Sequence, residues 1–577
     1  MSFTTSSSVT LPVGEGLEQD HTRMTGGNEH SPGHSVTPPA RAFLLSHNSS
    51  SRTLVVPETT NPSDETSWAT ASSTVVGDEN EDDEEEDGVA VPSKKGTRAY
   101  RYLRWNFGSV YRRIFTLAFL GNMAALVLVV VRSLLGGPSS RLTPGTCATA
   151  VSANILAALV IRNEHTVNAM FGVLALFPAA TPLAVRRAVA KVYSYGGIHS
   201  GCGVASLFWF VAFLVVLTGD LADPDAIRAY ILLDSYLICA LLAAIIGFAH
   251  PRARVLLHNW FEGTHRFLGW SVILLFWALV MMLAEDSSGG VPYAAALIAT
   301  PSFWMLIAIT LLVAYPWTRL RLRDVEAEPM SDHVVKLNFD YADVHYGQAV
   351  RLTDAPLRET HAFAVIPNPA AAAGDDDGGD NGDKAPRGLS NAGKRGFSVL
   401  VSNAGDWTDK IIRNPPRKMW TRGVPQFGVL RVAGLFEPCI VVATGSGIGP
   451  CLSLFVQKPD HPVRIVWSAQ RPAETYGQAV VDALYRADPD AVVIDTKKTG
   501  GRPDLVAIAY RIWEASRRRA LGLAQDEGGA AAAAKKTAKK TGPCEAVVII
   551  SNQKVTRKVV YGLESRGIPA YGAIFDS

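Results

Sequence analysis

The sequence lacks closely paired cysteines, an excess of charge of either sign and an apolar segment directly after Met1. No C-x-x-C pair occurs among the six cysteines, so neither a zinc site nor a disulfide framework is indicated, and we expect reduced structural thiols. With 55 basic and 53 acidic residues the net charge is only +2, which argues against a nucleic-acid partner. Without an apolar core near Met1 we expect no secretory signal peptide, so the first apolar stretch must act as the membrane signal. The cysteines are Cys147, Cys202, Cys239, Cys439, Cys451 and Cys544.

Apolar residues make up 48% of the chain and concentrate between Ile114 and Pro316. Six stretches there approach the ~20 residues that cross a bilayer. They span about 114 to 135, 148 to 177, 201 to 219, 229 to 249, 266 to 284 and 296 to 316. The polar run from Arg162 to His165 interrupts the second stretch, which is too short for two crossings, so we predict one long tilted helix with a buried polar patch. His165 beside Glu164 indicates a polar helix contact, with an ionisable functional cluster as the alternative.

Basic residues precede the first stretch and follow the second, fourth and sixth, whereas acidic residues follow the third and fifth. After the second stretch, for example, come Arg186, Arg187 and Lys191. Because basic loops stay on the cytoplasmic side, we predict a multi-pass membrane protein with both termini in the cytoplasm, in a membrane that the sequence does not specify.

Four regions differ in composition. The first is rich in Ser, Thr, Gly and Pro and ends in an acidic run, so we predict a disordered tail that serves as a spacer or as a docking segment. After the apolar region, closely spaced short apolar runs predict the strands of a small antiparallel barrel, at 333 to 339, 347 to 352, 363 to 366, 397 to 402 and, with the sequence VLRVA, 429 to 433. Alternating strands and helices then predict an open parallel sheet. The predicted boundaries are 1–92 for the tail, 93–323 for the transmembrane domain, 324–434 for the barrel with an insert at 370–394, and 435–577 for the α/β domain with an insert at 522–541.

The segment VVATGSGIGP, from Val441 to Pro450, reads as a strand followed by a glycine-rich turn and a helix. Gly445, Gly447 and Gly449 would let backbone amides approach a diphosphate, and the next helix could begin at Pro450. Such turns also occur in α/β proteins without a nucleotide, and the spacing is not the full G-x-G-x-x-G fingerprint. In the barrel region, GDWT from Gly405 lies between a strand and a predicted helix that Thr408 could cap while the first amides bind a phosphate.

Together with GRPD at Gly501 to Asp504, these motifs resemble the cytoplasmic half of the ferric reductase and NADPH oxidase superfamily, over roughly residues 110 to 577. A closer resemblance is to fungal TmpA-like transmembrane flavoproteins. The segments that carry it are YGGIHSGCG from Tyr195, HNWFEGTHRFLGW from His258, GQAVRLTDAPL from Gly347, VVATGSGIGP from Val441 and SRGIPAYGAIFDS from Ser565. The resemblance implies a six-helix transmembrane bundle followed by a ferredoxin-reductase-like module, with an FAD-binding antiparallel β-barrel and an α/β domain that binds NADPH or NADH.

The resemblance also implies roles for individual residues. The flavin site would consist of His361, Phe363 against the isoalloxazine, and Gly405, Trp407 and Thr408 at the diphosphate. The nicotinamide nucleotide would lie on Gly445, Gly447 and Pro450, with Ser468 and Arg471 recognising the adenosine ribose or its 2′-phosphate. Phe575 would be the C-terminal aromatic that lies over the flavin and moves aside for catalysis, or else an ordinary core aromatic.

Two segments depart from the family pattern. Ala364 stands where a hydroxyl usually contacts the flavin, and Ser551, Asn552 and Gln553 replace the usual Cys-Gly-Pro near the nicotinamide. We therefore expect flavin binding to be retained better than fast hydride transfer.

The resemblance implies haem ligation by histidines of the third and fifth spans. His199 and His265 begin these spans within His-x-x-x-Gly, and Gly203 and Gly269 could let a flat ring approach, so one inner haem could form. An outer layer would need histidines about 14 residues further on, or roughly 20 Å away. Those positions hold Ala212, Phe213, Ala278 and Leu279. We therefore predict no complete electron path across the membrane, and interfacial histidines are the alternative to a haem.

The sequence as a whole predicts a membrane flavoprotein oxidoreductase that passes reducing equivalents from NAD(P)H through FAD to an unknown acceptor on the cytoplasmic side or in the inner leaflet. Its partners would be the lipid bilayer, a nicotinamide nucleotide and that acceptor. The alternative is a regulatory membrane protein that responds to nucleotide or flavin but turns over slowly. A transporter with a redox-like domain is disfavoured because no inverted repeat is present.

Overall fold

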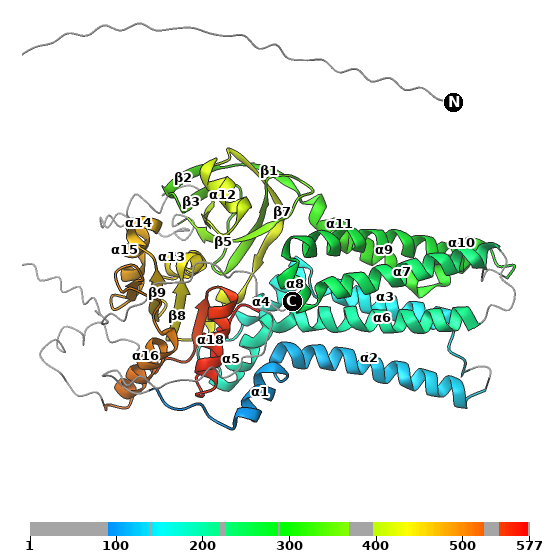
Figure 1. The fold of residues 1–577 in the computed structure, drawn as a ribbon, viewed down its shortest axis with the longest axis horizontal. Coiled ribbons are helices and arrows are strands. Elements are labelled where there is room, and N and C mark those ends of the chain that lie inside the picture. The colour runs from blue at the N-terminus through cyan, green and yellow to red at the C-terminus, as the bar shows by residue number, and fades with distance from the viewer. Residues whose placement is uncertain are drawn as a thin grey trace, which may run out of the picture. The chain divides into compact units, whose positions relative to one another are not determined.

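The structure is a computed structural model that describes residues 91–137, 140–219, 226–286, 289–368, 396–523 and 542–574. The predicted tail up to residue 90, the insert at 370–394 and residues 524–541 of the second insert lie outside these ranges. The first described region is helical (Figure 1). Its elements are α1 (Arg98–Asn106), α2 (Val110–Leu135), α3 (Pro144–Val160), α4 (Glu164–Leu174), α5 (Leu183–Val189), the 3-10 helix η2 (Ala190–Tyr195), α6 (Gly196–Gly219), α7 (Ala226–Ala249), α8 (Pro251–Leu256), α9 (His258–Asp286), α10 (Tyr293–Ala299) and α11 (Pro301–Thr318).

Within the described residues, five helices are long and apolar enough to cross a membrane, and α3 with α4 would be a sixth span if the bent pair counts as one. The prediction of one continuous helix over 148–177 is wrong, because α3 and α4 are bent by 58°. The second helix starts afresh at Asn163, whose side-chain oxygen accepts a hydrogen bond from the His165 N–H at 3.0 Å and so forms an N-cap. The predicted buried polar patch is present, since Glu164 is 3% exposed.

The helical region has its own apolar core, which includes Trp209, Phe210 and Phe213 of α6. A polar contact lies beside it: Asn122 Oδ1 accepts hydrogen bonds from Asn154 Nδ2 at 2.7 Å and from Trp209 Nε1 at 3.1 Å. These two bonds join α2, α3 and α6 and satisfy groups that would be costly to bury alone.

The second region is a curled antiparallel sheet of seven strands (Figure 1). Its elements are β1 (Arg321–Asp324), β2 (Glu326–Ser331), β3 (Val334–Phe339), β4 (Gln348–Thr353), β5 (His361–Pro367), β6 (Phe397–Ser402), the helix α12 (Asp406–Arg413) and β7 (Lys418–Phe427), in the order β1-β7-β4-β5-β6-β3-β2. The predicted strand at 429–433 is wrong. That segment is the 3-10 helix η4 (Val429–Leu435), in which Leu430, Val432 and Ala433 are buried, because the Arg431 N–H bonds back to Gly428 O and turns the chain.

The third region is a parallel five-stranded sheet with helices. It comprises β8 (Cys439–Thr444), the 3-10 turn η5 (Gly445–Gly447), α13 (Ile448–Gln457), β9 (Val463–Ala469), α14 (Pro472–Tyr476), α15 (Gln478–Ala487), β10 (Val492–Asp495), α16 (Leu505–Ala520), β11 (Val547–Ile550), α18 (Gln553–Glu564) and β12 (Ala570–Gly572). The strand order β10-β9-β8-β11-β12 places the topological switch between β8 and β11. Both predicted sheets are thus confirmed.

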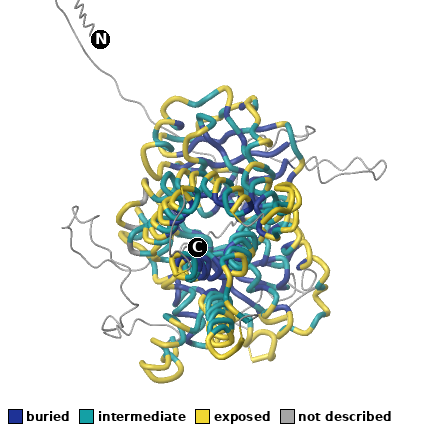
Figure 2. Tube along the Cα trace, turned by 90° about the vertical axis from the view of Figure 1, so that its right-hand side faces the viewer, coloured by how far each residue is buried: buried dark blue, intermediate teal, exposed yellow. Residues whose placement is uncertain are grey.

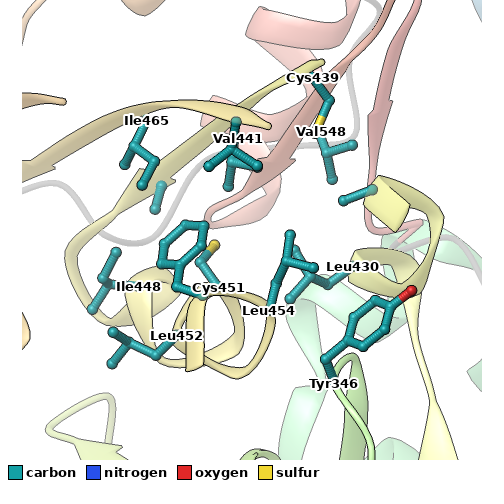
Figure 3. Packing of buried hydrophobic residues seen from close by; sticks show 14 of the residues in the cluster. Tyr346, Leu430, Cys439, Val441, Ile448, Cys451, Leu452, Leu454, Ile465 and Val548 are labelled. Carbon is teal, nitrogen blue, oxygen red and sulfur yellow. The ribbon is translucent and has the colours of Figure 1, made fainter. Parts of the chain in front are cut away.

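The core between the two sheets is continuous. Val441 of β8, Ile448, Cys451 and Leu454 of α13, and Val548 of β11 belong to one buried cluster (Figure 3). Burial raises the pKa of the Cys439 and Cys451 thiols well above their usual range, so these side chains behave as apolar core residues. Figure 2 shows that the buried trace follows the strands, whereas helices carry most of the exposed trace.

The segment between α4 and α6 contacts the α/β domain through ion pairs. Arg186 is 4% exposed and donates to both carboxylate oxygens of Glu545, at 2.5 and 2.7 Å, and to Leu435 O. Lys191 Nζ lies 2.8 Å from Glu564 Oε1. The basic residues that predicted a cytoplasmic loop therefore have carboxylate partners in the α/β domain.

Candidate functional site

The glycine turn lies at the carboxyl end of β8, at the switch between β8 and β11. A β-carbon on Gly447 would clash with Ile550 O of β11, and Gly445 has a positive φ of +49°. The carbonyl of Gly445 accepts a hydrogen bond from Trp467 Nε1 at 3.0 Å. The helix begins at Ile448, not at Pro450, which lies in its first turn. Packing against β11 therefore explains Gly447 without a ligand, while the exposed Ser446 leaves the outer side of the turn accessible.

Two hydroxyl groups meet at this switch. Thr444 Oγ1 at the end of β8 is hydrogen-bonded to Ser551 Oγ, which directly follows β11. Ser551 lies at the position where the resembled family has a cysteine thiol. In this chain that position carries a hydroxyl that is hydrogen-bonded to Thr444. The sequence analysis did not identify Thr444, although it directly precedes the glycine turn.

Ser468 lies near the end of the neighbouring strand β9, and Arg471 follows that strand. Ser468 is buried and pairs in register with Thr444. Arg471 has a left-handed backbone with a φ of 41°, and its N–H donates to Asp495 Oδ1 at 2.9 Å. Its guanidinium is exposed, 3.5 Å from Glu474. The side chain is therefore accessible to an anion from solvent, beside the acidic Glu474.

Asp495, at the end of β10, organises a basic loop that the sequence analysis missed. Its Oδ1 accepts the Lys497 N–H at 3.0 Å, and Lys498 Nζ lies 4.0 Å from Oδ2. The pair Lys497 and Lys498, shortly after a short apolar strand, is the sequence feature that could have identified this loop. One carboxylate oxygen of Asp495 thus holds the backbone of both Arg471 and Lys497.

His361, Phe363 and Trp407 come together, as the resemblance implies. The centroid of the Trp407 ring lies 4.2 Å from that of His361 and 5.8 Å from that of Phe363, with the latter pair stacked at 25°. Phe363 packs with Trp407 against the core of the antiparallel sheet, so the neighbour of Phe363 is the Trp407 indole. His361 Nε2 is buried and has no hydrogen-bond partner among the described residues. A buried nitrogen of this kind fits a ligand that offers a hydrogen bond.

Gly405 is the N-cap of α12 and forms no side-chain cap. Thr408 is not the cap: it lies in the first turn, accepts the Ala404 N–H at 2.8 Å and donates to Gly405 O at 2.8 Å. A β-carbon on Gly405 would meet nothing within 4 Å. Open space and uncapped amides fit a diphosphate, although Asp406 and Asp409 add negative charge to the same turn.

Asp354 supports this helix from the loop between β4 and β5. Its Oδ2 lies 2.8 Å from Lys410 Nζ and 3.8 Å from Arg358. Burial alone would raise the pKa of the Asp354 carboxyl, but Lys410, Trp407 and Arg358 favour its charged form and hold the pKa below its usual value.

The two candidate haem ligands face each other. The ring centroids of His199 in α6 and His265 in α9 lie 6.2 Å apart. His199 Nδ1 bonds to Ala158 O at 2.9 Å, which leaves Nε2 as a free ligand nitrogen. A metal held between two such rings, at about 2 Å per bond, requires ring centres roughly 6 Å apart. A β-carbon on Gly203 or Gly269 would meet nothing within 4 Å. The pair therefore fits one metal group with adjacent open space.

Two other expectations can be placed. His165 Nε2 lies 2.6 Å from Tyr315 Oη of α11, so the predicted polar helix contact is confirmed. Phe575, predicted as the catalytic aromatic, lies outside the described residues.

A protein-family model described as adenylate-forming reductase 03009, C-terminal domain, matches residues 429–523 and 525–577. Two curated relatives from Coprinopsis cinerea are similar over 84% of this chain: adenylate-forming reductase 03009 at 39% identity and adenylate-forming reductase 06235 at 37%. The match covers 42% of each relative, so this chain spans less than half of their length. These names differ from the expected TmpA-like flavoproteins, and that finer resemblance stays a prediction.

Similar solved structures include a flavohemoglobin from Malassezia yamatoensis, with a TM-score of 0.32 and 14% identity, covering 74% of this chain and 99% of that one. A ferredoxin-NADP+ reductase from Plasmodium falciparum has a TM-score of 0.28 and 10% identity, covering 44% of this chain and 96% of that one.

Proposed function

We propose that the chain is an oxidoreductase whose two-sheet module binds FAD and a nicotinamide nucleotide. One observation carries the proposal: the antiparallel sheet with α12 precedes a parallel sheet whose glycine turn lies at the topological switch, and α13 packs directly against β5. The end of a parallel sheet at such a switch is where nucleotides bind in open α/β folds. The same packing brings the nucleotide turn next to the strand of His361 and Phe363.

Different residues would bind the flavin and the different parts of the nicotinamide nucleotide. His361, Gly405 and the first amides of α12 would hold the flavin, with Trp407 as the aromatic surface beside it. The glycine turn would hold the diphosphate of the nicotinamide nucleotide, and Arg471 with the Asp495 loop would meet the adenosine end. When bound, a flavin accepts hydride from reduced nicotinamide. Thr444 and Ser551 would orient the nicotinamide ring, since both hydroxyls lie at the switch.

We further propose that the helical region spans a membrane and that the module and both termini lie on the cytoplasmic side. Five helices have the length and composition of membrane spans, and α2 exposes large apolar side chains such as Leu117, Leu128 and Leu134. In this proposal His199 and His265 would hold one haem near the inner surface, and this haem would supply a one-electron carrier on the cytoplasmic side. The predicted domain boundaries belong to this proposal.

A weakly active regulatory protein is the second candidate. Ala364 offers no hydroxyl, and the Ser551 hydroxyl that replaces the thiol is already bonded to Thr444. The reductase in the relatives' printed names favours the first candidate. Their adenylate-forming activity is not part of the proposal for this chain.

The test is an optical spectrum of the purified full-length chain before and after dithionite, with FAD measured after denaturation. The proposal expects bound FAD near one per chain, and Trp407→Ala should lower it severalfold. Trp513→Ala, a half-buried tryptophan of α16 remote from β5, is the matched control. No bound flavin in the wild-type chain would refute the flavin assignment. Rapid NAD(P)H oxidation with ferricyanide would exclude the regulatory candidate.

A further inference from the structure

A cavity of about 220 Å³ lies away from both nucleotide sites, between the loop after α4 and the segment around η4. The loop contributes Leu174, Phe177 and Pro178 to the lining, and the rest of the lining includes Tyr346, Arg431 and Lys458. The volume is several times the roughly 30 Å³ that one water molecule occupies. The lining therefore combines residues with apolar side chains and two cationic residues.

Both cations lie over one aromatic ring. The Arg431 guanidinium is 4.2 Å from the centroid of Tyr346 and 4.7 Å from that of Phe427, and Lys458 Nζ is 5.2 Å from the Tyr346 centroid. No carboxylate of the described chain forms an ion pair with either side chain. Aromatic faces attract cations, but they do not cancel the repulsion between two neighbouring positive charges. An anion between them would do so.

One carboxylate, Glu437, also lines the cavity. Its Oε1 lies 3.7 Å from His461 Nδ1, and its backbone N–H donates to Glu545 Oε2 at 2.8 Å. With Arg431 and Lys458 the lining carries two positive charges and one negative charge, so it retains a net positive charge.

We propose that this cavity binds a phosphate group carried on an apolar body. The planar fork of Arg431 suits two phosphate oxygens, and the ammonium of Lys458 supplies a second charge. The wall formed by Leu174, Phe177 and Pro178 takes the apolar part. The ligand is either the headgroup of an anionic lipid or a soluble phosphate compound, since both offer the same chemistry.

The position links the helical region to the nucleotide domain. Lys458 is the C-cap of α13, the helix whose other end follows the glycine turn, and Leu174 ends α4. Tyr346 is tied to the same helix, because its N–H donates to Gln457 Oε1 at 2.6 Å. A ligand in the cavity would therefore contact both regions at once.

The test follows the thermal unfolding midpoint of the purified full-length chain, because a ligand that binds the folded state raises it. One arm titrates inorganic phosphate against sodium chloride at equal ionic strength. The other compares short-chain phosphatidic acid with short-chain phosphatidylcholine. Each arm uses the wild type, Arg431→Gln, Lys458→Gln and the control Arg486→Gln, which removes an exposed charge from α15.

The proposal expects a saturable rise of the midpoint in at least one arm, with apparent affinity at least about tenfold weaker in the two cavity variants and unchanged in the control. A rise with inorganic phosphate assigns a soluble ligand, and a rise with phosphatidic acid alone assigns a lipid headgroup. If Arg431→Gln does not fold, the Lys458→Gln variant still tests the proposal, because Lys458 is exposed. No saturable rise in either arm, or an equal rise in all four proteins, would overturn the proposal.

Discussion

The carboxylate of Glu164 occupies the space beside Gly423 that a side chain there would fill. A β-carbon on Gly423 would lie inside contact distance of both Glu164 oxygens, and the residue has a φ of +72°. Glu164 also pairs with Arg351 and accepts the Val424 N–H at 2.8 Å. One turn later, Asn168 bonds to Pro425 O and to the Phe427 N–H. The broken span is thus fixed along β7 of the antiparallel sheet.

Gly423→Ala should lower the free energy of unfolding by about 1–3 kcal/mol, because the methyl group would force Glu164 out of its site. Gly500→Ala is the matched control: Gly500 has a φ of +71°, but a β-carbon there meets nothing within 4 Å. Thermal unfolding of both purified variants separates backbone strain from the clash. Equal losses in the two proteins would show that the Glu164 contact adds nothing.

The Arg186–Glu545 pair should be strongly coupled. The side chains are 5% and 17% exposed, and breaking a buried pair leaves an uncompensated charge that costs about 3–5 kcal/mol. We expect Arg186→Met and Glu545→Gln each to destabilise the chain strongly and the double variant to lose less than their sum. The exposed pair Lys418–Asp324, at 61% and 81%, should give a coupling below about 1 kcal/mol in the same cycle. Additive losses for Arg186 and Glu545 would contradict this expectation.

The elements that were predicted correctly from the sequence are those that depend on local residue patterns. Short apolar runs located β3, β4, β5 and β6, and the run Val441 to Gly449 located a strand, a glycine turn and a helix. The missed features depend on distant partners. Glu164 breaks its span to meet Arg351, which lies 187 residues away along the chain. Strand β7 was missed because Gly423 and Pro425 are typical of turns, and they are accommodated there by the side chains of α4.

The candidate site likewise contains residues that a motif predicted and residues whose role depends on partners far away in the sequence. The motif residues His361, Phe363 and Trp407 meet as the resemblance implied, yet their mutual stacking depends on how α12 folds over β5. Asp495 was missed because its role is to hold the backbone of Arg471, 24 residues earlier. Side-chain to backbone contacts of this kind leave no periodic signal in a sequence.

Asp354 should make stability depend on pH. Its pKa is held below the ordinary value of 3.8, so the charged form stabilises the fold above that pH, and this contribution is lost as the pH falls through the lowered pKa. Asp354→Asn should therefore cost up to about 1 kcal/mol at pH 6, because Lys410 is largely exposed, and the difference from the wild type should shrink below pH 4. Urea unfolding at several pH values measures it, with the exposed Asp324→Asn as control. A difference that grows towards acid would reverse the assigned sign.

His199 and His265 give the sharpest test of the membrane half of the proposal. If they hold one haem, His199→Ala and His265→Ala should each abolish the haem absorbance of the dithionite-reduced protein, because one histidine from each of two helices would hold the group and either variant removes one of them. His165→Ala should leave the spectrum unchanged while it removes the hydrogen bond to Tyr315, so it controls for loss of a histidine in the helical region. Flavin content should be unaffected in all three, because none of the three residues is among those proposed to hold the flavin. A haem spectrum that survives both substitutions would place the metal elsewhere. A wild-type spectrum with flavin alone would show that the 6.2 Å pair holds no haem and that electrons remain within the two-sheet module.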